Sequence, residues 1–246
     1  MGQVTSLFAW KVAAQIECAA DRAALLRSVG IDPDGPVDPA RMLPDDAYYA
    51  FFERAARADP DGTALPLRVG ASMRADEYGA FGLAWKSAPS LRGSYERAER
   101  YARVLTSVTR YELHEAGPEV QMLLHREGER RLGLRLSNEA SIASIMAISQ
   151  QVTTARFQPS AVHFKHPAPE SVAGHRAHFG CPVHFASDID ALCVPREQLR
   201  EPNRLGDPAI ARFFDAHLEA ELSGLGDDAS LEQRVRIQVA QCLSEG

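Results

Sequence analysis

Cysteine is scarce in this sequence, and the few cysteines are scattered. Cys18, Cys181, Cys193 and Cys242 occur without any CxxC spacing. The absence of CxxC pairs excludes a zinc ribbon, and the scattered positions give no indication of a disulfide framework. We therefore expect reduced thiols, as in most intracellular proteins.

Long apolar runs and clustered positive charge are also absent. No stretch of 18 apolar residues occurs, and the apolar run near the N-terminus is too interrupted for a signal peptide. The formal net charge of −6 argues against a binder of duplex DNA or anionic membranes, because both partners reward clustered lysine and arginine. A cytoplasmic protein without membrane contact is expected.

The common catalytic and nucleotide-binding motifs are missing as well. The sequence has no GxxxxGK[ST], no GxGxxG after a predicted strand, and no GxSxG, HExxH or DxDxDG. Their absence excludes the hydrolase, metalloprotease and EF-hand classes that carry them. We predict that the protein is not an enzyme and needs no cofactor.

One segment, GHRAHFGCPVHF, does place potential metal ligands at every third position: His175, His178, Cys181 and His184. A zinc site needs three or four ligands that converge on one point. Gly180 and Pro182 break the helix that could align them, so we interpret these residues as surface and boundary positions around a turn. A metal site remains the alternative.

The first half of the sequence has helical periodicity. Apolar residues recur at steps of three and four up to Gly30, which predicts one or two amphipathic helices. Three further helices are predicted near Pro44, from Leu67, and from Leu91 with Ser90 as N-cap. The glycine-containing segment EYGAFGLAWKSAPS is interpreted as a turn that leads into a buried segment.

In the second half the period changes to that of strands. Residues alternate on both sides of AGPE in TRYELHEAGPEVQMLLHREG, which predicts a β-hairpin. A long helix capped by Ser137 is predicted next. The strands SAVHFKHP and ALCVPREQL follow, with a short helix between them. A helix capped by Asp207 and a last helix within 226–246 complete the chain's predicted elements. This order indicates an α+β fold with helices packed on a small antiparallel or mixed β-sheet.

Aromatic residues concentrate in otherwise polar helices. They are Tyr48, Tyr49, Phe51, Phe52, Tyr78, Phe81, Trp85, Tyr95 and Tyr101. Small-molecule pockets are mostly apolar with a few placed polar groups, although ordinary core packing also explains each residue singly. In VHFKH, strand alternation puts His166 on the same face as Phe164, as a core histidine or a polar contact in a cavity.

Two blocks of the sequence resemble a known family. LPLRVGASMRADEYGAFGLAWKSAPSLRGSYERAERYARVL and AVHFKHPAPESVAGHRAHFGCPVHFASDIDALCVPREQL are similar to the effector-binding N-terminal domain of AraC/XylS-type transcription regulators. The similarity is to the arabinose-binding-like subgroup, typified by ornithine-utilisation regulators. Positions that match in the second block are Val162, Phe164, His166, Pro169, Phe179, Gly180, Pro182, Val183, Phe185, Ala186, Leu192 and Leu199.

The resemblance covers most of residues 20–225, with departures. Pro66 stands where a glycine is usual, RGSY replaces a common geAl, and Asp190 takes the place of an asparagine. Members of the family continue into two helix-turn-helix motifs, which are expected to lie outside this chain. Residues 1–225 are then the effector-binding and dimerisation domain, and residues 226–246 a helix that leads toward the DNA-binding domain.

The resemblance implies a ligand sensor that binds a small organic effector, such as an amine, an amino acid, an aromatic acid or a fatty acid. DNA would be bound only through the helix-turn-helix domain. The predicted pocket residues are Tyr48, Phe52, Trp85, Tyr101, Phe164 and His166, with Arg100 or Arg156 as partner for an anionic group. A homodimer is expected through the helix around Ala209–Leu222, whose Phe213, Phe214, Leu218 and Leu222 fit either an interface or an internal core.

Two alternatives stay open. One is a metal- or haem-dependent sensor or enzyme that uses the segment from His175 to His184. The other is a constitutive dimerisation module with no effector.

Overall fold

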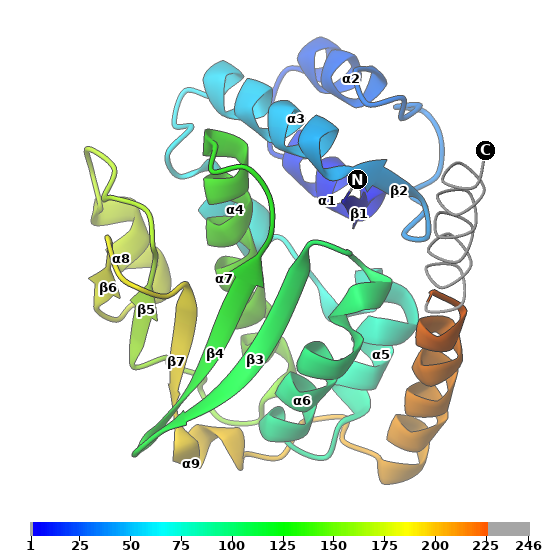
Figure 1. The fold of residues 1–246 in the computed structure, drawn as a ribbon, viewed down its shortest axis with the longest axis vertical. Coiled ribbons are helices and arrows are strands. Elements are labelled where there is room, and N and C mark those ends of the chain that lie inside the picture. The colour runs from blue at the N-terminus through cyan, green and yellow to red at the C-terminus, as the bar shows by residue number, and fades with distance from the viewer. Residues whose placement is uncertain (1, 226–246) are drawn as a thin grey trace, which may run out of the picture.

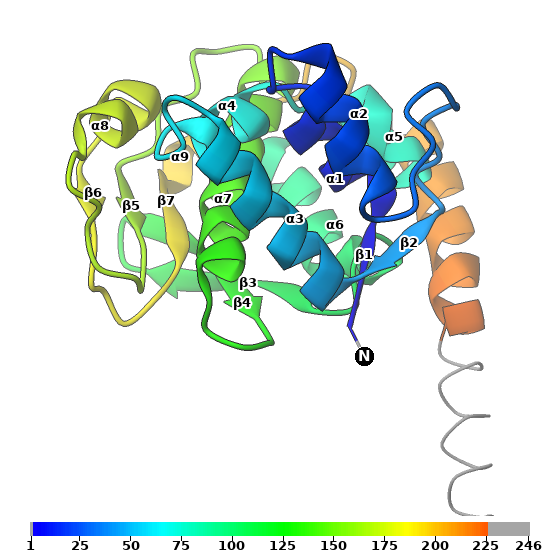
Figure 2. The same cartoon turned by 90° about the horizontal axis from the view of Figure 1, so that it is seen from above.

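A long helix, α7, lies at the centre of the fold. The computed structural model describes residues 2–225, and within them α7 spans Leu132–Val152. It runs between the larger β-sheet and a layer of helices that includes α1 (Ser6–Ala13), α3 (Asp45–Ala58) and α4 (Leu65–Ala71) (Figure 2). Because α7 has neighbours on both sides, most of its residues are buried.

The larger sheet has five strands in the order β3-β4-β7-β5-β6. The strands are β3 (Thr109–Ala116), β4 (Glu119–Arg126), β5 (Ala161–His163), β6 (Val183–His184) and β7 (Ala191–Pro195). All neighbours are antiparallel except β5 and β6. A separate antiparallel pair joins β1 (Gln3–Thr5) to β2 (Met42–Pro44). The predicted α+β class is confirmed, and its sheet is mixed.

The remaining helices flank these layers (Figure 1). They are α2 (Ala19–Arg27), η1 (Ala75–Tyr78), α5 (Gly79–Ser87), α6 (Leu91–Tyr101), η2 (Ala102–Val104), α8 (Ala173–Phe179), α9 (Arg196–Leu199) and a helix over residues 208–225. Two of the three predicted caps are present: Ser90 Oγ accepts from the Gly93 amide, and Asp207 Oδ1 accepts from the Ala209 amide. The helix predicted for residues 226–246 lies outside the described residues. Over residues 2–225, no helix is long and apolar enough to cross a membrane.

Two predictions were wrong, one about the type of a segment and one about the start of a helix. The segment interpreted as a turn forms helix α5, in which Phe81, Ala84 and Trp85 share a buried face. Helix α7 begins at Leu132 rather than at Ser137, which lies buried inside it. The reason is that the cap comes from another helix: Glu53 of α3 accepts hydrogen bonds from the Gly133 amide (2.9 Å) and from Arg131 (2.7 and 2.9 Å).

Strand β4 brings a charged residue to the core side of the sheet. Its buried residues alternate, with Val120, Met122 and Leu124 facing the core. Arg126 is the next residue on that face, because side chains two positions apart in a strand point the same way. Across the hairpin, Arg126 pairs in register with Thr109, so these two side chains are neighbours.

Candidate functional site

A cavity of ≈ 50 Å³ lies in the core between α7, the β3–β4 hairpin and helices α1, α3, α4 and α5. Its walls are formed by Phe8, Tyr48, Val69, Met73, Tyr78, Phe81, Trp85, Ala102, Leu105, Thr106, Thr109, Tyr111, Arg126, Ser137, Ala140, Ser141, Ser144, Ile145 and Ile148. A cavity of this size holds a few water molecules. An organic ligand can enter only if some of the side chains in the walls move apart.

The cavity walls combine aromatic rings with a polar stripe on α7. Three tyrosine hydroxyls lie against three serines of that helix: Tyr48 with Ser137, Tyr78 with Ser144, and Tyr111 with Ser141. Burial raises the pKa of each tyrosine above its ordinary value, and the serine contacts offset this only in part. The hydroxyls therefore stay protonated at neutral pH and can act as donors and acceptors toward a ligand.

Arg126 is the one charged side chain among the residues that line this cavity. Its Nε donates to Asn138 Oδ1 (2.6 Å) and its Nη2 donates to Ser141 Oγ (2.9 Å). The third nitrogen, Nη1, is buried and has no hydrogen-bond partner within the described part of the chain. Two other buried donors on the cavity walls, Trp85 Nε1 and Thr109 Oγ1, also have no hydrogen-bond partner among the described residues.

A second hollow of ≈ 470 Å³, the basic groove, shares the lining residue Arg126 with the cavity. It is lined by Arg126, Gly128, Arg130, Arg131, Leu132, Leu134, Arg135, Asn138, Lys165, His166, Pro167 and Asp190. Arg131 is paired with Glu53, and Arg135 with Glu139. Arg130 and Lys165 are exposed and have no ion-pair partner among residues 2–225.

The six predicted aromatic and histidine pocket residues divide between four places. Tyr48 and Trp85 line the cavity. Phe52 and Tyr101 are buried in the core but do not line it. Phe164 packs in a separate aromatic cluster with Phe179 and Phe185, while His166 lies on the wall of the basic groove.

Neither predicted arginine lines the cavity. Arg100 is on the surface of α6, where its Nε forms an ion pair with Glu219 at 2.5 Å. Arg156 is exposed in the loop after α7. The arginine that does reach the cavity, Arg126, was not predicted, although the alternation of VQMLLHR in β4 carries the signal that would have found it.

The histidine segment is only partly as predicted. His175, interpreted as a surface or boundary residue, is 1% exposed, and its Nε2 lies 2.8 Å from Glu139 Oε2. His166 Nε2 lies 3.0 Å from Glu139 Oε1. The prediction for His175 was wrong because α8 packs that residue inward, where a carboxylate from α7 meets it. The described residues contain no group of three or more His, Cys, Asp or Glu arranged to hold a metal ion.

Cys181 is also unsuited to act as a nucleophile. Burial raises the pKa of its thiol to about 11, so the reactive thiolate is scarce at neutral pH.

Comparison with known proteins agrees with the resemblance. The model for the N-terminal arabinose-binding domain of AraC transcription regulators matches residues 20–203. The structure is similar to the crystal structure of the transcriptional regulator CdpR from Pseudomonas aeruginosa, with a TM-score of 0.58 and 17% identity, over 83% of this chain and 60% of that one. This likeness shows a shared fold, and the chain spans less than two thirds of CdpR. The comparison with curated proteins gives no match. Since the family match extends over well above half of the sequence, the chain belongs to the N-terminal arabinose-binding domains of AraC transcription regulators.

Proposed function

We propose that this chain is the ligand-sensing part of an AraC-type regulator, in which a small organic effector enters the core cavity and changes the helix over residues 208–225. One observation carries the proposal. Helix α5 lines the cavity with Phe81 and Trp85, and α5 is also bonded to the segment that starts the 208–225 helix. A ligand that moves the ring of Trp85 therefore acts on an element that holds the 208–225 helix.

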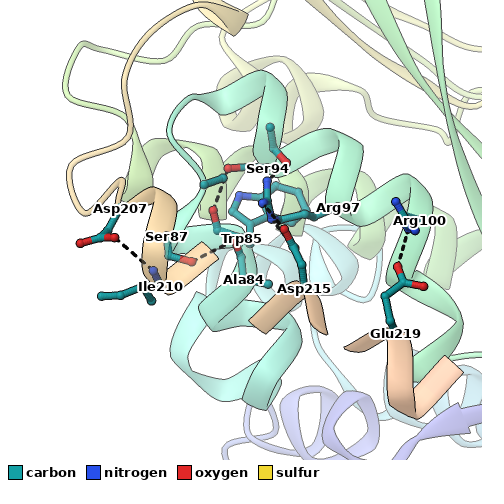
Figure 3. A network of polar contacts seen from close by, with 12 residues as sticks. Ala84, Trp85, Ser87, Ser94, Arg97, Arg100, Asp207, Ile210, Asp215 and Glu219 are labelled. Carbon is teal, nitrogen blue, oxygen red and sulfur yellow. Dashed lines mark hydrogen bonds and ion pairs between the residues drawn. The ribbon is translucent and has the colours of Figure 1, made fainter. Parts of the chain in front are cut away.

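The first bonds in this route surround Trp85 (Figure 3). The backbone carbonyl of Trp85 accepts from Ser94 Oγ at 2.8 Å, which joins α5 to α6. The carbonyl of Ser87 accepts from the amide of Asp207 at 2.8 Å, immediately before the 208–225 helix. Asp207 in turn caps that helix. Small shifts of α5 are thus passed on to the start of the helix.

Ion pairs fix the rest of the helix against α6 (Figure 3). Arg97 binds Asp215 with two hydrogen bonds of 2.9 and 2.6 Å, and Arg100 binds Glu219. These ion pairs can be exchanged for others at modest cost, while Leu218 of the same helix is buried in the core. Coupling free energies between sites in allosteric proteins are about 1–3 kcal/mol, which is comparable to the strength of such contacts.

Filling the cavity tests the proposal. Ala140→Met adds a flexible side chain to the cavity wall, where Ala140 is only 6% exposed. We expect an unchanged or higher melting temperature and loss of the thermal shift given by any effector found in a screen of organic acids, amino acids and amines. A ligand at about 100 times its Kd stabilises a protein by roughly 2.7 kcal/mol, so the loss is measurable.

The matched control is Ala24→Met, at an exposed position of α2. It should leave the thermal shift unchanged. Undiminished effector binding in Ala140→Met would place the ligand outside the cavity, and a broad panel without any hit would favour a dimerisation module without effector.

Breaking the contact between α6 and the 208–225 helix tests the transmission route. Arg97→Gln removes a bidentate ion pair whose side chains are 15% and 29% exposed. We expect amide exchange in residues 208–225 to rise a few-fold, because this contact contributes about 1 kcal/mol. Effector-induced protection of that helix should fall while binding itself persists. Arg92→Gln removes ion pairs on the other side of α6 and should not change the exchange of the helix.

The same helix is the proposed dimer contact. Leu218 is fully buried in this chain and belongs to its own core, whereas Phe213 is 69% exposed and Ile210 49% exposed. Exposed apolar side chains on a surface helix favour a partner surface. We propose that a second copy covers them, and that DNA is bound by a helix-turn-helix domain outside residues 2–225. Sedimentation velocity of the wild type and Phe213→Ser reads the association state, and a monomeric wild type would refute the dimer.

A further inference from the structure

We infer that the effector is an organic anion, a carboxylate with an aromatic or alkyl body, whose charged group binds Arg126. This inference rests on the proposed function, since it names the class of ligand that the cavity takes. It replaces the wider choice among amines, amino acids and acids with one chemical class.

The first argument is the state of the guanidinium group. Arg126 forms hydrogen bonds only to neutral acceptors, Asn138 and Ser141, and no carboxylate of residues 2–225 forms an ion pair with it. Its Nη1 is buried with no acceptor. Arg126 is half-buried, and a partly desolvated charge without a counter-ion is unfavourable. Its buried Nη1 donor without a partner adds to that cost. An incoming anion would relieve both.

The second argument is the set of unpaired donors on the cavity walls. Thr109 Oγ1 lies on the neighbouring strand in register with Arg126, and Trp85 Nε1 lines the same cavity. All three groups can donate a hydrogen bond, so a ligand that carries acceptors would satisfy them. A carboxylate supplies only acceptors, with two oxygens that can receive several hydrogen bonds. An ammonium group supplies only donors and would meet the positive charge of Arg126.

The third argument is the charge of the opening. The basic groove shares Arg126 with the cavity. Its one acidic lining residue is Asp190, whereas Arg130 and Lys165 are without ion-pair partners within the described residues. This occurs in a chain with a formal net charge of −6. A locally positive groove on an acidic protein concentrates anions and raises their association rate. The groove is therefore the proposed entrance.

The size of the charge and the character of the walls favour a carboxylate over a phosphate. One guanidinium group reaches the cavity, which matches one negative charge. The other residues on the cavity walls are uncharged and mostly aromatic or aliphatic, such as Phe8, Phe81 and Ile148. Such walls suit an apolar body, because burying apolar surface is what provides affinity there.

Matched pairs of an acid and its amide provide the test. Benzoate with benzamide, cinnamate with cinnamamide, and octanoate with octanamide differ in charge but hardly in shape. Binding to the wild type is measured by thermal shift and by the fluorescence of the tryptophans. We expect at least one acid to bind 10-fold or more tightly than its amide, because a hydrogen bond to a charged group is worth a factor of 10 or more in affinity.

Variants of Arg126 show whether this residue carries the preference. Arg126→Gln should bind the acid roughly 10- to 100-fold more weakly and bind the amide about as well as the wild type does. Arg126→Lys keeps the charge and should retain part of the preference, which also covers the case that Arg126→Gln does not fold. Arg27→Gln, at an exposed position of α2 without an ion pair in the described chain, should match the wild type.

The association and dissociation rates of the acid test whether the groove is the entrance. Arg130→Gln combined with Lys165→Gln should slow association of the acid and reduce its dependence on salt, with dissociation unchanged.

The outcomes separate the inference from the function on which it rests. Equal binding of acid and amide, or a full acid preference in Arg126→Gln, would overturn the carboxylate while leaving an effector cavity in place. Acid binding that survives in Ala140→Met but is lost in the Arg130 and Lys165 double variant would assign the anion to the outer groove and overturn the inference. Failure of every acid, amide and amine would count against the inference and the proposed function together.

Discussion

Glu139→Gln is expected to lower the free energy of unfolding by about 3–5 kcal/mol, the usual cost of breaking a buried ion pair by removing one partner. Glu139 is fully buried in α7 and lies within 3.2 Å of three basic side chains: Arg135 (3.2 Å), His166 (3.0 Å) and His175 (2.8 Å). A neutral amide keeps the shape of the side chain but leaves these groups without their anion. Urea unfolding measures the loss.

The same contact makes stability depend on acid pH. Burial alone would raise the pKa of Glu139, but the nearby side chains of His166 and His175 lower it to about 2. A carboxyl whose pKa is lower in the folded state contributes stability above its unfolded value, near 4.5, and this contribution is lost as the pH falls toward 2. Glu139→Gln should therefore show a shallower loss of stability across that range than the wild type.

A surface pair of the same spacing is the control. Glu96 pairs with Arg92 at i,i+4, as Glu139 does with Arg135, but its side chain is 54% exposed. Glu96→Gln should cost no more than about 0.5 kcal/mol, because exposed helix pairs contribute little. Equal losses in the two variants, or equal acid slopes in Glu139→Gln and the wild type, would show that the buried cluster does not stabilise the fold.

Gly70→Ala is expected to destabilise the protein by about 1–3 kcal/mol, the usual range for overpacking. A Cβ at Gly70 would lie 2.4 Å from the Ala143 Cβ and 2.7 Å from the Ala140 carbonyl oxygen, where α4 touches α7. Alanine gains up to about 1 kcal/mol in helix propensity. The clash outweighs this gain, because the atoms it meets belong to the backbone and Cβ of the central helix. Thermal and urea unfolding give the sign directly.

The control substitution has the opposite sign. Gly174 is an exposed glycine of α8, and a Cβ there would meet nothing within 4 Å. Gly174→Ala should be neutral or stabilising by up to about 1 kcal/mol. A stabilised Gly70→Ala variant would mean that α4 can move away from α7 at little cost, and then the cavity between them would also be easier to open.

Much of the fold could be predicted from local pattern. The helix with Tyr48 and Phe52, the hairpin around AGPE and the caps Ser90 and Asp207 depend on residues close together in sequence, so periodicity and turn chemistry suffice. Helix α5 was missed because its glycines resemble turn residues, whereas packing of Phe81 and Trp85 decides its conformation.

The site was less predictable. Periodicity identifies which residues turn inward but not which inward residues surround an empty space. Tyr48 and Trp85 were predicted and line the cavity, while Phe52, equally buried, packs elsewhere. The alternation of side chains along β4 points Arg126 toward the core. Only the packing of α7 against the hairpin leaves the Nη1 of Arg126 without an acceptor.

The sequence by itself determined most of the elements, the family and the fold class, because these follow from the spacing of apolar residues and from two blocks of family positions. Only the tertiary structure decided where charges meet. Glu53 caps a helix that starts 79 positions after it in the chain, and Glu139 meets His175 across 36 positions. Such long-range pairs leave no periodic trace in a sequence, since their energies depend on burial that exists only once the layers have packed.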